Sequence, residues 1–166
     1  MKVLILFAFL AIVLGKPEDV EKKTIAKSDC PGGWYDVGSK CLFILDAAEP
    51  GREWELAAEF CKDMGGEMIS WTDESEYFQV KFILAEKCVA ENNCENWYWT
   101  GARLNEDANV WMWENGDLVP DFSWNPGQPW AAHTYATFHG GDVNTDMFGN
   151  DGSKQGYAFI CQIVKM

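Results

Sequence analysis

The sequence predicts an α+β domain, closed by disulfide bridges, with two helices, small antiparallel sheets and a long irregular loop region. Three observations support this fold class. The spacing of apolar residues changes from helical to strand-like after Cys94. The chain carries six cysteines, an even number behind a signal-like N-terminus. Finally, the stretch 117–156 is rich in glycine, proline, asparagine and aspartate, which is typical of a functional loop region.

The N-terminus predicts a secretory signal. Lys2 precedes an unbroken apolar run over 3–14, and Gly15 is a small residue suited to cleavage. The run is shorter than the ~20 residues that a membrane-spanning helix needs. A retained membrane anchor is the alternative that the sequence leaves open. We therefore expect a secreted protein without a membrane span, divided into a signal peptide at 1–15, a flexible leader at 16–29 and one domain at 30–166.

Composition narrows the classes of ligand. The formal net charge of −13 at pH 7 repels phosphate backbones, so nucleic acid is not an expected partner. The cysteines favour disulfides over metal ligation because no C-x-x-C pair exists, and His133 and His139 stand away from any cysteine. Spacing alone leaves every pairing of the six cysteines open.

The first elements predicted are a hairpin and a helix. Residues 34–45 alternate aromatic and aliphatic side chains around Gly38-Ser39-Lys40, as a hairpin would. A helix follows and ends at Gly65-Gly66, as helices commonly do at glycine. Its apolar face is formed by Trp54, Ala57, Ala58, Cys61 and Met64.

A second helix is predicted up to Cys88, with Thr72 or Asp73 as its N-cap. Glu74 and Glu76 in its first turn suit the positive end of the helix dipole. The helically spaced apolar residues expected to face the core are Phe78, Val80, Phe82 and Leu84.

Strands are predicted after Cys94, at 97–104 and 110–113, with Asn115-Gly116 as a tight turn. The long region that follows holds one expected strand, at 134–138, and the chain closes with a buried strand at 157–164. The tryptophans at strand spacing, expected in the core, are Trp97, Trp99, Trp111 and Trp113.

Several motifs in this order resemble the C-type lectin-like domain over residues 30–164. The motifs are Phe60-Cys61 with Gly65-Gly66 and Glu76, Trp99-Thr100-Gly101, Gln128-Pro129-Trp130, Gly149-Asn150-Asp151 and Phe159-Ile160-Cys161. The resemblance implies a secreted, non-enzymatic lectin that binds glycans or glycoproteins in recognition of microbial or self surfaces. It also implies a bridge between Cys61 and Cys161 and, in the longer form of the domain, one between Cys30 and Cys41. Cys88 and Cys94 are then left to pair with each other.

The resemblance also locates a calcium and sugar site, which is degenerate here. In sugar-binding members, a Glu-Pro-Asn or Gln-Pro-Asp triplet supplies two calcium ligands around a proline that follows a cis peptide bond. The third residue here is Trp130, whose only polar atom is a donor, so it cannot ligate a cation. The later Asn150-Asp151 pair is kept, but Gly149 replaces its usual tryptophan neighbour. The intermediate glutamate of the family falls near Ala132, or near Asp142 if the loop is realigned.

We therefore expect calcium binding to be weak or absent. The candidate metal ligands are Gln128, Asp142, Asn150 and Asp151, and the candidate carbohydrate-binding residues are Gln128, Trp130, Asn150 and Asp151. An EF-hand beginning at Asp142 is excluded because Met147 and Ser153 stand where glycine and glutamate are required. The alternative for this oxygen-rich segment is a solvated acidic loop.

The sequence also allows a second class of function. No H-E-x-x-H, G-x-S-x-G or P-loop motif occurs, so the sequence predicts no enzyme. The competing class is a non-enzymatic extracellular interaction or matrix protein that uses the fold to bind protein or surfaces without sugar. Trp130 could stack on a sugar ring, anchor a protein partner or cover the base of its loop.

Overall fold

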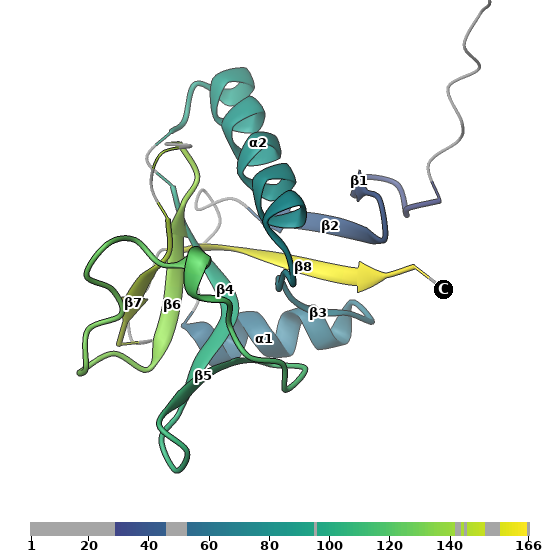
Figure 1. The fold of residues 1–166 in the computed structure, drawn as a ribbon. Coiled ribbons are helices and arrows are strands. Elements are labelled where there is room, and N and C mark those ends of the chain that lie inside the picture. Colours follow the sequence, from purple (N-terminus) through teal and green to yellow (C-terminus); the bar gives the residue numbers. More distant parts are fainter. Residues whose placement is uncertain are drawn as a thin grey trace, which may run out of the picture.

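The structure is a computed structural model that describes residues 29–45, 53–94, 96–141, 144, 146–151 and 157–165. The expected signal peptide and all but the last residue of the expected leader lie outside the described residues. Figure 1 shows a twisted sheet whose long strand β8 runs between the two helices, with α2 on one side and α1 on the other. The elements are β1 Tyr35–Val37, β2 Lys40–Leu45, α1 Trp54–Asp63, β3 Glu67–Met68, α2 Glu74–Glu91, β4 Trp97–Asn105, β5 Val110–Trp113, the 3-10 helix η1 Asp121–Ser123, β6 Tyr135–His139, β7 Phe148–Asn150 and β8 Ala158–Val164.

The strands join in one sheet with the order β1-β2-β8-β4-β6-β7, to which β3 and β5 add as branches. The expected antiparallel pairing holds for every strand pair except β4 and β8, which pair in parallel at Tyr98 with Ala158 and Trp99 with Phe159. β8 is buried over Ala158–Gln162 because helices and side chains cover both of its faces. Such two-sided burial explains why this strand is a nearly continuous apolar run.

The sheet separates two hydrophobic clusters. α1 packs with Trp99 and Phe159 on one side, through Trp54, Ala57 and Cys61. The other cluster contains the inner face of α2 together with Trp71 and Trp113. Of the tryptophans expected in the core, Trp99 and Trp113 are fully buried, whereas Trp97 and Trp111 are half-buried.

Both helices begin and end near their predicted boundaries. α1 stops at Asp63 and is followed by Gly65 in the left-handed conformation. α2 is capped by Asp73, whose carboxylate accepts a hydrogen bond of 2.9 Å from the backbone N–H of Glu76. Within the described part of the chain, no helix is both long and apolar enough to cross a membrane.

The inner face of α2 differs from the sequence expectation. Val80 and Leu84 are buried as expected, but Phe78 and Phe82 are 57% and 61% exposed. Their places toward the core are taken by Tyr77 and Lys81. A buried lysine is tolerated there because its Nζ pairs with Asp146 at 2.9 Å, a partner that lies 65 residues further along the chain.

The three disulfides match the pairing that the family resemblance implies: Cys30–Cys41, Cys61–Cys161 and Cys88–Cys94. The second of these joins α1 to β8 inside the cluster around Trp99. The long region after β5 holds β6 near its predicted position. It also holds β7, which the sequence did not reveal because Phe148-Gly149-Asn150 shows no strand alternation.

Candidate functional site

The loop at 124–130 is held against β7 by two hydrogen bonds. The backbone N–H of Asn125 donates to the carbonyl of Met147 at 3.0 Å. The side-chain oxygen Oε1 of Gln128 accepts from the backbone N–H of Gly149 at 3.1 Å. The Gln128–Pro129 peptide bond is cis, as in the corresponding triplet of the family. The structure thus brings the Gln-Pro and Gly-Asn-Asp motifs together, although they are about twenty residues apart.

Trp130 is presented at the end of this loop. Its indole stacks on the imidazole of His133, with ring centroids 5.6 Å apart and an interplanar angle of 28°. The turn between them is closed by a hydrogen bond of 3.0 Å from the N–H of His133 to the carbonyl of Trp130. Trp130 is nevertheless 62% exposed. One face of the indole is therefore supported, and most of the side chain remains open to a ligand.

The glycine at position 149 has a structural reason. A Cβ added there would lie 2.8 Å from both Cβ and Nδ1 of His133. A larger residue at this position requires His133 to move, and Trp130 rests on His133. The family's usual tryptophan before Asn-Asp is therefore incompatible with the stacked pair found here.

Asn150 is the last residue of β7, the strand at the edge of the sheet beside β6. It is opposite Tyr135 in the β6–β7 pairing, and its Nδ2 donates to the hydroxyl of Tyr157 at 3.5 Å. Its buried Oδ1 has no hydrogen-bond partner within the described residues. Asp151 follows at the end of β7 and is exposed. Asn150 and Asp151 thus extend from the same strand that anchors Gln128.

The carboxylate of Asp146 interacts with two residues of α2. Its Oδ1 accepts a hydrogen bond of 2.5 Å from the hydroxyl of Tyr77 and pairs with Lys81 at 2.9 Å. Burial raises the pKa of Tyr77 above its ordinary value, and the hydrogen bond to Asp146 adds to this rise. The carboxylate is therefore directed under α2, where it neutralises a buried ammonium group.

The described oxygens do not fit a full calcium shell. Calcium takes six to eight oxygen ligands, but Gln128 Oε1 already accepts a backbone N–H and Asp146 is paired with a lysine. Of the other candidate ligands, Asn150 has its Oδ1 buried, Asp151 is exposed, and Asp142 lies outside the described residues. Among the residues that the structure does describe, no group of three or more histidine, cysteine, aspartate or glutamate side chains could hold a metal ion.

A groove that the sequence did not predict lies beside the loop. Its volume is about 520 Å³, and Trp111, Trp124 and Pro129 line it together with Asp121 and neighbouring residues. The two indoles meet edge to face, with centroids 4.7 Å apart. Strand alternation puts Trp111 on the same face of β5 as the buried Trp113, and Trp111 packs against the edge of that core cluster, where the groove begins.

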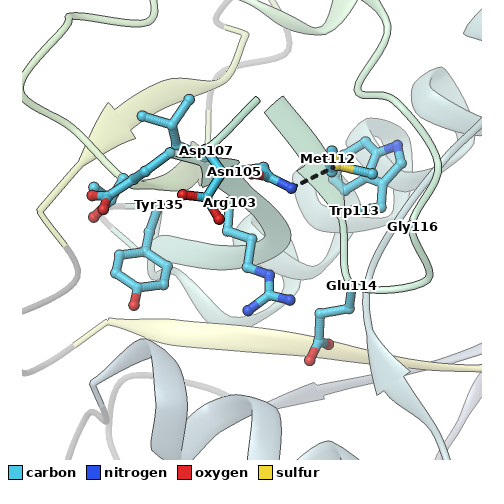
Figure 2. Close-up of a pocket in the computed structure, with 11 residues that line it drawn as sticks. Arg103, Asn105, Asp107, Met112, Trp113, Glu114, Gly116 and Tyr135 are labelled. Atoms are coloured by element: carbon cyan, nitrogen blue, oxygen red, sulfur yellow. Dashed lines mark hydrogen bonds between the residues drawn. The ribbon is translucent and has the colours of Figure 1, made fainter. Parts of the chain in front are cut away.

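A second hollow, of about 550 Å³, lies between the β4–β5 hairpin and the start of β6 (Figure 2). Figure 2 shows the side chain of Arg103 between those of Tyr135 and Glu114. The side chain of Asn105 contacts the sulfur of Met112 at 3.7 Å. Burial raises the pKa of Tyr135 to about 12, and the hydrogen bond from its hydroxyl to Glu55 contributes. The lining carries both signs of charge and includes none of the predicted ligand residues.

The chain is similar in sequence to known lectins. No family model matches the chain. Ladderlectin of Oncorhynchus mykiss is 26% identical over 121 residues, which cover 72% of this chain and 60% of ladderlectin. The galactose-specific lectin nattectin of Thalassophryne nattereri is 28% identical over 123 residues, or 74% of this chain and 72% of nattectin. The chain thus spans only about three fifths of the length of ladderlectin.

Among solved structures, the Ca²⁺-independent C-type lectin SPL-2 from Saxidomus purpuratus superposes with a TM-score of 0.66 at 23% identity. The superposition covers 81% of this chain and 94% of SPL-2. At that identity the likeness is evidence of the fold. Together with the three bridges, these findings show that the chain has the C-type lectin-like fold and is similar in sequence to curated lectins.

Proposed function

We propose that the chain is a secreted carbohydrate-binding lectin that holds a neutral sugar on the loop at 124–130, with little or no help from calcium. The observation that carries the proposal is Trp130, a large exposed indole fixed by stacking on His133 beside the anchored Gln-Pro motif. Ladderlectin and nattectin, both named as lectins, support the class of function. SPL-2 supports a function without calcium, because it is a Ca²⁺-independent C-type lectin of the same fold.

The chemistry of the loop suits a pyranose ring. The C–H faces of a sugar pack on an indole, and a ring already held in place loses little entropy on binding. Gln128 keeps an amide N–H₂ donor after its oxygen is used. Asn150 follows on the strand that anchors Gln128, but its Oδ1 is buried and must be uncovered before it can accept from a sugar. Asp151 adds a carboxylate that can accept from sugar hydroxyls. The negative net charge disfavours acidic sugars, so a neutral sugar is the expected ligand.

Any calcium would be held by Gln128, Asn150 and Asp151, with Asp142 as a further candidate. When bound, the calcium ion would coordinate sugar hydroxyl oxygens. Its affinity should lie at the weak end of the range for extracellular modules, about 10⁻⁴–10⁻³ M, because few charged oxygens remain for the ion. Asp146, another carboxylate in this segment, is paired with Lys81.

The test is the substitution Trp130→Ala, measured by calorimetric titration with the monosaccharide that scores best on a glycan array. Aromatic stacking contributes about 0.5–1.5 kcal/mol, so affinity should fall about two- to twelvefold. The matched control is Tyr35→Ala, an exposed aromatic on β1 at the opposite end of the sheet order from β7. Equal affinity in Trp130→Ala and Tyr35→Ala would exclude the stacking role of Trp130.

The competing function is an extracellular interaction or matrix protein that binds protein or surfaces without sugar. The exposed phenylalanines of α2 favour it, since large apolar side chains at a surface commonly mark an interface. The glycan array separates the two functions. Absence of binding to every glycan, with and without calcium, together with a captured protein partner, would support the interaction protein.

A further inference from the structure

The groove beside the Gln-Pro loop is presented by the same loop as the exposed indole of Trp130. Its volume of about 520 Å³ lies within the roughly 300–1,000 Å³ of small-molecule sites. Gln128 and Pro129 both line it, and Trp130 is the next residue of the chain. We call this hollow, with Trp111 and Trp124 in its wall, the Trp111 groove. A ligand that rests on Trp130 and extends along the loop would therefore reach the Trp111 groove.

Both walls of the Trp111 groove are fixed by backbone hydrogen bonds. On one side, the N–H of Val119 donates to the carbonyl of Trp111 at 3.0 Å. On the other side, the N–H of Gln128 donates to the carbonyl of Asn125 at 2.9 Å, and the N–H of Asn125 donates to the carbonyl of Met147 at 3.0 Å. A site whose walls are already in place loses less entropy when a ligand binds. The Trp111 groove is thus preformed.

The lining combines apolar surfaces with a few polar groups. The half-buried indoles of Trp111 and Trp124 meet edge to face, with centroids 4.7 Å apart. Asp121 is exposed and Asn125 is half-buried. Within the described residues, neither the carboxylate of Asp121 nor the side-chain amide of Asn125 takes part in a hydrogen bond. A sugar ring has C–H faces that pack on aromatic rings and hydroxyls that bond to carboxylates and amides, so this lining suits a sugar.

We propose that the Trp111 groove holds the second ring of a glycan whose first ring rests on Trp130, so that the chain binds neutral oligosaccharides more tightly than monosaccharides. This inference rests on the proposed sugar site at Trp130. The second ring packs against the indoles of the groove, and its hydroxyls donate to Asp121 and bond to the amide of Asn125.

The charge and the position of the Trp111 groove favour this occupant over others. Asp121 is the only ionisable side chain among the described residues that line it. A carboxylate without a basic neighbour repels acidic sugars, which leaves neutral rings. An acyl chain or another purely apolar group would make no use of Asp121 and Asn125. A second sugar ring uses both, and it is covalently joined to the ring on Trp130.

The test is calorimetric titration of the disulfide-bonded chain. The probes are galactose, glucose, mannose and N-acetylglucosamine, with the neutral disaccharides built from each. For the monosaccharide that binds, at least one disaccharide should bind about five- to tenfold tighter, the gain expected from one aromatic contact and one added hydrogen bond.

Two substitutions in the Trp111 groove separate the second ring from the first. Trp111→Leu and Asp121→Ala should each lower the preference for the disaccharide at least about twofold, with a change of less than about twofold in the affinity for the monosaccharide. Trp130→Ala should weaken the binding of both sugars. Asp63→Ala is the matched control, since it removes an exposed carboxylate from α1, outside the lining of the groove, and should preserve the preference. Circular dichroism confirms that each variant is folded.

Two results would overturn this inference and leave the sugar site at Trp130 in place. One is equal affinity for the monosaccharide and every disaccharide, with both weakened by Trp130→Ala. The other is a preference for the disaccharide that neither Trp111→Leu nor Asp121→Ala reduces. Failure of the proposed function looks different: no probe binds, or Trp130→Ala leaves the affinity for the monosaccharide unchanged.

An apolar occupant is tested with the octyl glycoside of the same monosaccharide. The octyl glycoside should bind less tightly than the best disaccharide, because its chain cannot bond to Asp121 or Asn125. Tighter binding of the octyl glycoside that is lost in Trp111→Leu would contradict the proposal and assign the Trp111 groove to an apolar group.

Discussion

The substitution Lys81→Met tests how the structure uses Asp146. Lys81 is only 4% exposed, and its Nζ lies 2.9 Å from the carboxylate of Asp146 and 4.9 Å from the ring centroid of Tyr77. Methionine keeps an unbranched apolar side chain of similar length but removes the charge. The variant therefore leaves the carboxylate without its cation while changing the packing of the helix little.

The expected cost follows from the burial of the two groups. Removing one partner of a fully buried ion pair costs about 3–5 kcal/mol. Asp146 retains 27% of its side-chain exposure and still accepts from the hydroxyl of Tyr77. Solvent and this hydrogen bond offset part of the loss, so Lys81→Met should lower the free energy of unfolding by about 2–3 kcal/mol. Adding Asp146→Asn should recover part of this loss, because the two effects are coupled.

The measurement is urea unfolding with the disulfides intact, analysed by linear extrapolation. Lys165→Met is the matched control, because Lys165 pairs with Asp36 at 2.6 Å on the surface and such pairs contribute about 0–1 kcal/mol. Equal losses in Lys81→Met and Lys165→Met, or strictly additive effects of Lys81→Met and Asp146→Asn, would refute the reasoning. Asp146 would then be free to act as a ligand.

Two further predictions concern the bridges and the site. In the chain-entropy model, replacing both cysteines of Cys61–Cys161, which are separated by 100 residues, should cost about 4.7 kcal/mol, against about 2.8 kcal/mol for Cys30–Cys41, separated by 11. Chemical denaturation measures both, and a larger loss for the shorter loop would contradict the model. Gly149→Ala should displace His133, lower stability by about 1–3 kcal/mol and weaken sugar binding. Gly32→Ala, where the added Cβ meets nothing within 4 Å, is the control, and equal behaviour of the two variants would show that Gly149 does not support the stack.

Much of the fold could be predicted because its determinants are local. The N-cap at Asp73 and the glycine that follows α1 are short-range signals, and the structure places both helix ends near them. The inner face of α2 could not be predicted in the same way. Whether Phe78 or Tyr77 turns inward depends on Asp146, which accepts from Tyr77 across 69 positions of sequence. A helical pattern alone treats the bulkier apolar residue as the buried one.

The candidate site could also be predicted only in part. The motif order located Gln128, Trp130 and Asn150, and the structure places their segments side by side. The contacts that give the site its present form were not visible in the sequence. Gln128 is fixed by a backbone N–H of β7, and Trp130 by the ring of His133, a residue that belongs to none of the motifs. Both contacts depend on how the long loop folds back on the sheet.

The most direct test of sugar binding without calcium is a glycan array probed with the disulfide-bonded chain in millimolar calcium and again in excess chelator. The same neutral glycans should be bound in both conditions, with signals that differ by less than about twofold. That result is predicted because Trp130 and the side chains around it supply the contacts, while Asp146 remains paired with Lys81. Binding that requires calcium and disappears in chelator would contradict the account.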